Sequence, residues 1–191
     1  MTEAHRRPKQ PELIRSQLLL VVRDILVQEG PHAVTLDAVS RRANVTKGGL
    51  QHHFRSKQAL LQALCDQLFE EFQANLALAF EREPTGPGRH ARAYIRTCFD
   101  THHPLNQVDT QRAIGLLALT LPEARERWHQ TMQTELAADA ETPGAADRLL
   151  VCRMAADGFW FSQMLDVYAL DDAHRARILA LLLQLCGPKE D

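Results

Sequence analysis

The residues between Thr35 and Lys57 combine hydroxyl, amine, amide and imidazole side chains in the short stretch TLDAVSRRANVTKGGLQHHFRSK. Hydroxyl and amine groups bind phosphate oxygens, whereas a glutamine amide can pair with the edge of an adenine base. Two short helices joined by Ala43-Asn44-Val45 would hold these groups in place, since Asn44 can adopt the positive φ that such a turn needs. The stretch therefore predicts a helix-turn-helix that contacts nucleic acid.

Threonines and glycines support the same prediction. Thr35 and Thr46 are good N-caps for the two helices. Gly48 and Gly49 follow in the first turn of the second helix, where each costs about 1 kcal/mol relative to alanine. We interpret these glycines as leaving room for DNA to approach the backbone closely, which would explain their cost. A frayed first turn would also tolerate glycine. The apolar residues spaced to pack the two helices together are Leu36, Val39, Val45, Leu50 and Phe54.

The segment from residue 12 to residue 62 resembles the TetR family of bacterial regulators. That family carries an alanine-glycine-valine type of turn, then Ser/Thr-Lys-Gly, then a His or Tyr before a Phe, and a Lys shortly afterwards. The matching residues here are Ala43-Asn44-Val45-Thr46-Lys47-Gly48-Gly49-Leu50-Gln51-His52-His53-Phe54 and Lys57. The remainder of the chain is similar to the family in helix number and size more than in residues.

The resemblance implies which residues contact DNA. Thr35, Thr46, Lys47 and Lys57 match phosphate-contacting positions, and Arg42 is a less regular one. Gln51 stands where the family often has tyrosine, so we predict that Gln51 and His52 contact bases. His53 is expected to pack toward the helix core. The predicted DNA-contacting set is Thr35, Arg42, Thr46, Lys47, Gly48, Gln51, His52 and Lys57.

The charge distribution agrees with a polyanionic partner for the N-terminal part. Residues 1–57 carry ten Lys and Arg but five Asp and Glu, although the whole chain has a net charge of −2. The rest of the chain is therefore acidic. A cationic head on an acidic body favours DNA as the partner of the head, and chance clustering of charge is the alternative.

Apolar spacing predicts an all-α protein of about nine helices, because no segment alternates with period two. The long helix expected over residues 57–82 has apolar residues four apart, so its stripe winds around the helix and its two ends should face different neighbours. The predicted parts are a flexible basic arm (1–10), a three-helix DNA-binding head with the helix-turn-helix (11–57), and an effector-binding and dimerisation body (58–191).

An acidic residue beside aromatic residues marks the body. Asp157 precedes Gly158-Phe159-Trp160-Phe161, and such a run is similar to one in the same helix of many TetR-family members. A buried Asp either bonds a neighbouring helix or faces an aromatic pocket suited to a cationic or amphipathic ligand. Both interpretations stay open at this point. The predicted effector-lining residues are Phe72, Phe99, His103, Leu117, Trp128, Met132, Asp157, Trp160 and Met164.

The last helix has an apolar arc too broad for one neighbour to cover, which favours a second subunit. The resemblance implies the same, with the final two helices of each subunit in contact. We expect Phe161, Ile178, Leu179, Leu182 and Leu185 at this interface. A two-fold dimer would bind a pseudo-palindromic operator.

These features together predict a cytoplasmic, ligand-responsive repressor that a small effector releases from double-stranded DNA. The sequence contains no catalytic motif, so we expect neither an enzyme nor a cofactor. It also has no apolar segment long enough to span a membrane, so we expect no membrane partner. The four cysteines form no CxxC and are expected to be buried, reduced thiols. The alternatives are a DNA-binding regulator without a small ligand, and an all-α metalloprotein that uses His102, His103 and His129.

Overall fold

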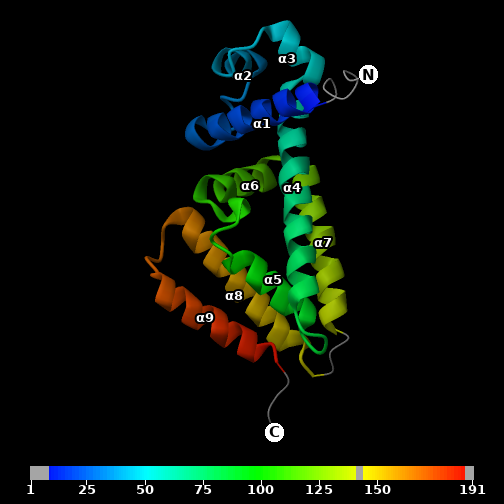
Figure 1. Ribbon diagram of the computed structural model, residues 1–191, viewed down its shortest axis with the longest axis vertical. Helices are drawn as coiled ribbons and strands as arrows, with labels where there is room; N and C mark the ends of the chain where they lie inside the picture. The colour runs from blue at the N-terminus through cyan, green and yellow to red at the C-terminus, as the bar shows by residue number, and fades with distance from the viewer. Residues whose placement is uncertain (1–8, 141–143, 188–191) are drawn as a thin grey trace, which may run out of the picture. The chain divides into compact units, whose positions relative to one another are not determined.

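The computed structural model describes residues 9–140 and 144–187, and these contain nine α-helices, one 3-10 helix and no β-strand (Figure 1). The predicted all-α fold is therefore confirmed. The helices are α1 (Lys9–Glu29), α2 (Leu36–Arg42), α3 (Lys47–His53), α4 (Lys57–Arg82), α5 (Arg89–Phe99), η1 (Pro104–Asn106), α6 (Val108–Thr120), α7 (Pro122–Ala140), α8 (Ala146–Leu165) and α9 (Asp172–Leu185). The predicted basic arm lies outside the described residues except for its last two, which already belong to α1.

The helices group into two compact units. The first unit contains the chain up to Leu68 together with Arg112–Ala124, and the second contains Phe69–Gln111 together with the chain from Arg125 onward. Helices α4, α6 and α7 each contribute residues to both units. The chain therefore passes from one unit to the other within these three helices.

The first unit has a core built by α1, α2, α3 and the start of α4. Helix α2 packs against both α1 and α3, and the guanidinium of Arg15 lies 5.4 Å from the centre of the Phe54 ring. Helix α1 ends at Gly30, which has a φ of +84° that glycine adopts without strain. The buried apolar residues of this core are Leu18, Leu19, Val22, Ile25, Leu26, Val34, Val39, Leu50, Phe54, Leu60 and Leu64.

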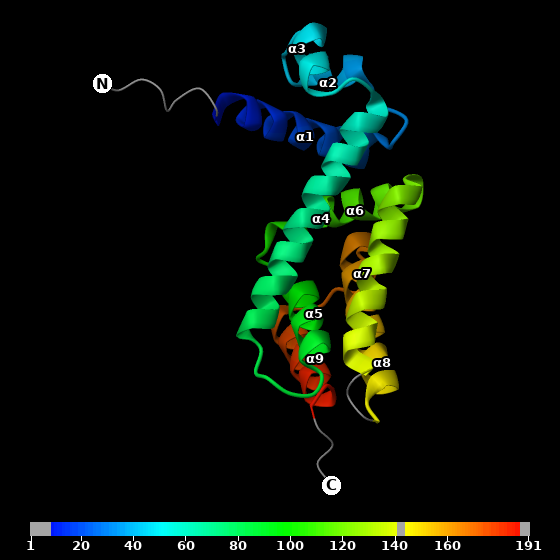
Figure 2. The same ribbon diagram turned by 90° about the vertical axis from the view of Figure 1, so that its right-hand side faces the viewer.

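The apolar stripe of α4 passes from one unit to the other, as its four-residue spacing predicts. Leu60, Leu64 and Leu68 are buried in the first unit, whereas Phe72 and Leu76 are buried in the second. A four-residue step overshoots one helical turn by about 40°, so a stripe of this kind rotates along the helix. Figure 2 shows α4 as a single long helix.

The second unit is organised around α5, which packs against both α8 and α9. Figures 1 and 2 both show α5 alongside these two helices. The ring of Phe99 stacks on that of Phe159 from α8, with centroids 4.0 Å apart and planes 11° apart. The buried residues of α5 are Ala91, Ala93, Tyr94, Ile95, Thr97, Cys98 and Phe99.

Local features mark the ends of two helices of this unit. Helix α5 ends at Phe99 because the side-chain amide of Asn106 donates to the carbonyl oxygens of Thr97 and Asp100 at 2.8 and 2.7 Å. Helix α8 ends at Leu165 because Asp166 takes a left-handed conformation with φ +54°. A side-chain contact therefore accompanies the end of α5, and a left-handed residue accompanies the end of α8.

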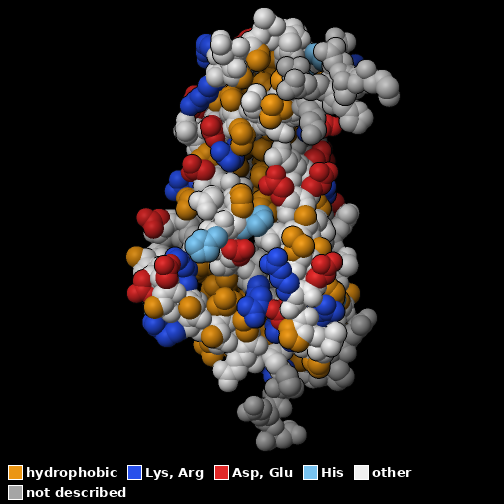
Figure 3. Space-filling model, in the orientation of Figure 1, with side chains coloured by type: hydrophobic (Ala, Val, Ile, Leu, Met, Phe, Trp, Pro, Cys, Tyr) orange, Lys and Arg blue, Asp and Glu red, His pale blue; other side chains and the backbone are white. Residues whose placement is uncertain are grey.

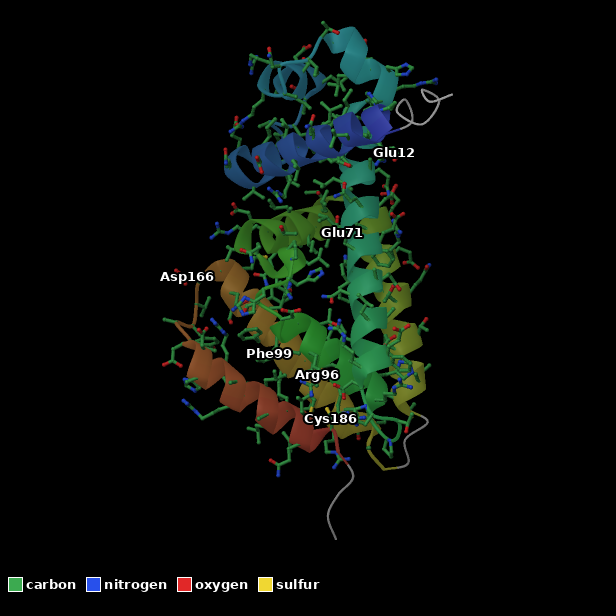
Figure 4. All side chains as sticks on the ribbon, in the orientation of Figure 1. Glu12, Glu71, Arg96, Phe99, Asp166 and Cys186 are labelled. Carbon is green, nitrogen blue, oxygen red and sulfur yellow. The ribbon has the colours of Figure 1, made fainter. Side chains whose placement is uncertain are left out.

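The start of α5 is held closely against the end of α9. Gly88, the N-cap of α5, has φ +72°, and a Cβ atom at this position would collide with the backbone oxygen of Cys186. Figure 4 shows Cys186 at the end of α9. Only glycine satisfies both the dihedral and the close approach.

Candidate functional site

The turn between α2 and α3 has the geometry that its sequence predicts. Asn44 adopts φ +53°, one of two non-glycine residues with positive φ among those described. The Val45 N–H then donates to the Ser40 carbonyl at 3.0 Å, which closes the turn. The side chain of Thr35 accepts from the Ala38 N–H at 3.1 Å, and that of Thr46 accepts from the Gly49 N–H at 3.0 Å. Both predicted N-caps are confirmed.

Helix α3 has one buried edge and one exposed polar face. Leu50 and the Phe54 that follows the helix are buried, which anchors α3 to the rest of the first unit. Other positions of α3 are exposed, with Lys47 one turn from Gln51 and Gly48 one turn from His52. The exposed part of α3 therefore presents the Lys47 ammonium, the Gln51 amide and the His52 imidazole, together with bare backbone at Gly48.

The glycines at the start of α3 differ in their surroundings. A Cβ at Gly49 would lie 3.1 Å from the Thr46 side-chain oxygen, so the capping geometry explains this glycine. A Cβ at Gly48 would meet nothing within 4 Å. No contact inside the protein therefore requires glycine at position 48, and both interpretations of this glycine stay open.

Two of the predicted DNA-contacting cations are paired with acidic residues. The Lys47 ammonium lies 2.8 Å from an Asp37 carboxylate oxygen. The Arg42 guanidinium donates to Glu29 and Gln28, each at 2.6 Å, and so joins the end of α2 to the end of α1. Arg42 thus has a structural role that the sequence alone did not indicate.

Lys57 is the remaining residue of the predicted DNA-contacting set, and His53 is the neighbour expected to pack toward the helix core. Lys57 is the first residue of α4 and half-buried, and the Ser56 hydroxyl before it accepts from the Ala59 N–H at 3.1 Å. His53 is half-buried against Phe54, with ring centroids 6.4 Å apart. That position agrees with the predicted packing role of His53.

Two protein families match this chain. Residues 19–64 match "Bacterial regulatory proteins, tetR family", and residues 88–187 match "Tetracyclin repressor-like, C-terminal domain". The second match alone covers more than half of the chain. The chain belongs to the TetR family. It is accordingly a transcriptional regulator of that family, and the residues that match the tetR regulatory-protein description include both α2 and α3.

Curated TetR-family relatives align mainly through the helix-turn-helix. UidR of Escherichia coli K12 is 37% identical over 70 residues, which cover 37% of this chain and 33% of UidR. EthR of Mycolicibacterium smegmatis is 29% identical over 109 residues, which cover 56% of this chain and 48% of EthR. These alignments span between a third and a half of each relative.

Solved structures show the same fold over nearly the whole chain. A transcriptional regulator from Rhodococcus sp. Rha1 has a TM-score of 0.66 at 22% identity, over 90% of this chain and 95% of that one. NalD, the secondary repressor of a multidrug efflux pump in Pseudomonas aeruginosa, has a TM-score of 0.65 at 19% identity, over 92% and 96%. At these identities the likeness shows the TetR fold.

Three of the predicted effector-lining residues of this TetR-family chain join one aromatic cluster in the second unit. Phe72 lies edge-on to Trp128, with centroids 4.7 Å apart, and also contacts the ring of Tyr94 at 6.3 Å. The Tyr94 hydroxyl donates to the Asp157 carboxylate. Tyr94 was missed from sequence because its partners Phe72 and Asp157 come from two other helices, α4 and α8.

The other predicted effector-lining residues do not share that cluster in the described contacts. Phe99 is buried in its stack with Phe159, and the His103 ring nitrogen accepts from the Leu105 N–H at 3.3 Å. Leu117 is buried in the first unit. Half-buried positions on α7 and α8 are occupied by Met132, Trp160 and Met164.

A buried arginine connects three helices of the second unit. Arg153 on α8 is 3% exposed, and it donates to Asp139 at 2.6 Å and to Glu135 at 3.1 Å, both on α7. Asp139 also accepts from the Ala91 N–H of α5 at 3.2 Å. The same guanidinium carbon lies 4.9 Å from the centre of the Tyr94 ring. Sequence analysis missed this network, although a lone Arg in the apolar run of α8 was a usable signal.

Burial and neighbouring groups set the protonation of the cluster. Burial raises the pKa of Asp157, and the Tyr94 hydrogen bond and the Arg153 charge oppose that rise. Burial also raises the pKa of Tyr94 well above its usual value, and the Asp157 charge raises it further. The Tyr94 hydroxyl therefore remains the donor in its hydrogen bond to the Asp157 carboxyl group.

Other features of the described residues concern metal-binding groups, free cysteines and membrane-spanning helices. No group of three His, Cys, Asp or Glu side chains within residues 9–140 and 144–187 is arranged to hold a metal ion. The four cysteines are free and buried, as predicted. No described helix combines the length and apolarity needed to cross a membrane.

Proposed function

We propose that this TetR-family regulator is a ligand-responsive repressor that binds a pseudo-palindromic operator as a homodimer. The exposed face of α3 carries the proposal, because its polar side chains share one side of a helix whose other side is buried. The match of residues 88–187 to a tetracyclin repressor-like domain supports repression. FasR of Mycolicibacterium smegmatis, a transcriptional activator 31% identical over 86 residues, favours activation as the second candidate.

The proposed DNA contacts divide into positioning and base contacts. Thr35, Thr46, Lys47 and Lys57 would bind phosphates, which fix the position of α3 without selecting a sequence. Gln51 and His52 would contact base edges in the major groove. Gly48 would allow the DNA backbone or base edges to come close to α3. Arg42 stays in the proposed set. Its guanidinium would have to give up its hydrogen bonds to Glu29 and Gln28, or share them, in order to bind a phosphate.

The proposed dimer face lies on α8 and α9. Figure 3 shows hydrophobic side chains at the surface along α9. Phe161 and Leu185, both in the predicted set, are 51% and 42% exposed, whereas Leu182 is 6% exposed and belongs to the core of its own subunit. Ile178 and Leu179 are half-buried. Other exposed apolar residues that extend this face are Val151, Met154, Leu165 and Leu181.

A face of this kind predicts a stable dimer, because large exposed apolar patches on a monomer mark association sites. Sedimentation equilibrium is expected to give twice the 21.6 kDa chain mass. A monomeric mass at micromolar concentration would contradict the dimer.

The proposed effector is cationic or aromatic and binds near Asp157. The supporting observation is a chain of contacts in which Asp157 accepts from Tyr94, the Tyr94 ring contacts Phe72, and Phe72 contacts Trp128. Aromatic faces and a carboxylate in one cluster favour a cation. EbrR, a structural neighbour with a TM-score of 0.58, is described as a multidrug binding protein complexed with imidazole. Because α4 and α6 run through both units, a ligand that moves either helix in the second unit could alter the first.

Replacing Asp157 by asparagine tests the effector proposal. Because burial raises the pKa of Asp157, folding favours the protonated carboxyl, and stability is lost as pH rises through the folded-state pKa. D157N carries no charge but keeps an acceptor for Tyr94, so we expect its melting temperature to exceed that of the wild type at pH 8 and the difference to shrink toward pH 4. Thermal unfolding followed by circular dichroism measures both effects.

The same D157N protein is expected to lose its response to cationic compounds. Hydrophobic cations that release the wild type from DNA should need about 10-fold higher concentration, because the anion is gone. Neutral aromatic compounds serve as the control. Equal release of wild type and D157N by every cation would contradict the effector role of Asp157.

A further inference from the structure

The Lys47–Asp37 pair places an acidic residue within the proposed DNA-contacting surface. Lys47 is the first residue of α3, and Asp37 lies in the first turn of α2. Their charged atoms are 2.8 Å apart, although both side chains are more than half exposed, at 56% and 70%. A phosphate that binds Lys47 would therefore come within a few ångström of the Asp37 carboxylate.

We propose that Asp37 competes with DNA phosphate for Lys47 and so weakens the binding of the head to any duplex. This inference rests on the proposed function. A carboxylate and a phosphate oxygen are alternative partners for one ammonium group, so a phosphate must displace Asp37 or share Lys47 with it. Asp37 would also repel that phosphate directly. A phosphate bound to Lys47 would lie closer to the Asp37 carboxylate than the screening length at physiological salt.

The pair of Arg42 and Glu29, also in the head, has a different arrangement. Arg42 donates to Glu29 and also to Gln28, so its guanidinium links α1 to α2 through two hydrogen bonds. The Lys47–Asp37 pair is the more exposed of the two, with side chains 56% and 70% exposed against 42% and 55% for Arg42 and Glu29, and exposed pairs contribute little to stability. We therefore assign the competing role to Asp37 and a fold-stabilising role to Glu29.

Asp37 also lies where a carboxylate favours a helix. An acid in the first turn of α2 interacts favourably with the helix dipole. Replacing Asp37 by asparagine should therefore leave stability unchanged or lower it slightly. A purely structural role for Asp37 would make D37N bind DNA equally well or less well, whereas competition makes it bind more tightly.

The experiment measures binding of the full-length protein to a mixed-sequence DNA duplex by fluorescence anisotropy at several salt concentrations. D37N is expected to lower Kd by about 1.5- to 5-fold, the range for exposed ion pairs. The slope of log K against log salt concentration should steepen by up to about 0.9, the value for one additional phosphate contact. Asp24→Asn is the matched control, because it removes a charge paired with Arg23 on α1 and should leave Kd unchanged.

A second variant separates competition for Lys47 from general repulsion. In a K47A background the gain from D37N should shrink to less than half, because no ammonium remains to be released. An unchanged or weaker affinity of D37N in the wild-type background would overturn the proposal, as would an equal gain with and without Lys47. If the wild-type protein itself shows no salt-dependent binding to any duplex, the proposed function fails instead.

Discussion

Replacing Arg153 by methionine is expected to lower the free energy of unfolding by about 3–5 kcal/mol, the usual cost of breaking one side of a buried ion pair. Arg153 is 3% exposed and donates to two carboxylates of α7. Methionine fills much of the volume but leaves Asp139, also 3% exposed, without its cation. A buried charge without a partner is costly, so the packing of α7 against α8 should weaken.

The measurement is thermal unfolding. For a chain of this size each kcal/mol shifts the melting temperature by roughly 2–4 °C, so R153M should melt about 10 °C lower. Arg125→Met, at an exposed position of α7, is the control and should change little. The double variant R153M/D139N should recover part of the loss because it removes the orphaned charge. A melting temperature of R153M within 2 °C of the wild type would show that the network does not hold these helices together.

Replacing Gly88 by alanine is the second change with a large expected effect. Alanine at φ +72° costs about 1–2 kcal/mol from the dihedral alone. The added Cβ would also collide with the Cys186 backbone oxygen and lie 3.1 Å from the Leu149 side chain. A backbone oxygen cannot move without shifting the end of α9, so overpacking should add about 1–3 kcal/mol.

Gly144 provides a matched control for Gly88. Its φ is +68°, nearly the same, but a Cβ there would meet nothing within 4 Å. G144A should therefore show the dihedral cost alone, and G88A should unfold at a clearly lower denaturant concentration. Chemical unfolding in urea compares the two variants. Equal midpoints for G88A and G144A would mean that α9 does not approach α5 as closely as described.

Local features of the head could be predicted from sequence because they depend on neighbours along the chain. The caps at Thr35 and Thr46 and the positive φ of Asn44 each involve groups within a few residues. The buried edge of α3 follows from the spacing of Leu50 and Phe54. Arg42 and Glu29 lie on different helices, and nothing in the residues around either one indicates the other as its partner. Their hydrogen bond was therefore not predicted.

The body illustrates what spacing leaves undetermined. The apolar arc of α9 was predicted, but Leu182 is buried while the adjacent Leu181 is 55% exposed. Which of two neighbouring stripes faces α5 depends on how the helices pack, and each residue rotates by about 100° around the axis. Asp157 similarly supported two interpretations until its Tyr94 partner was known. The hydrogen bond to a neighbouring helix is present, and the effector role stays a prediction.

The most direct test of the central claim measures the affinity of three proteins for two DNA duplexes across a range of salt concentrations. One duplex is the sequence that the wild type selects from random DNA, and the other is its scrambled version. K47A should weaken binding to both equally and flatten the salt dependence by about 0.9 per lost phosphate contact. Q51A should instead reduce the preference for the selected duplex, by about 1–3 kcal/mol, and keep the salt dependence. Wild-type protein that binds neither duplex in a salt-dependent way would contradict the placement of α3 in the major groove.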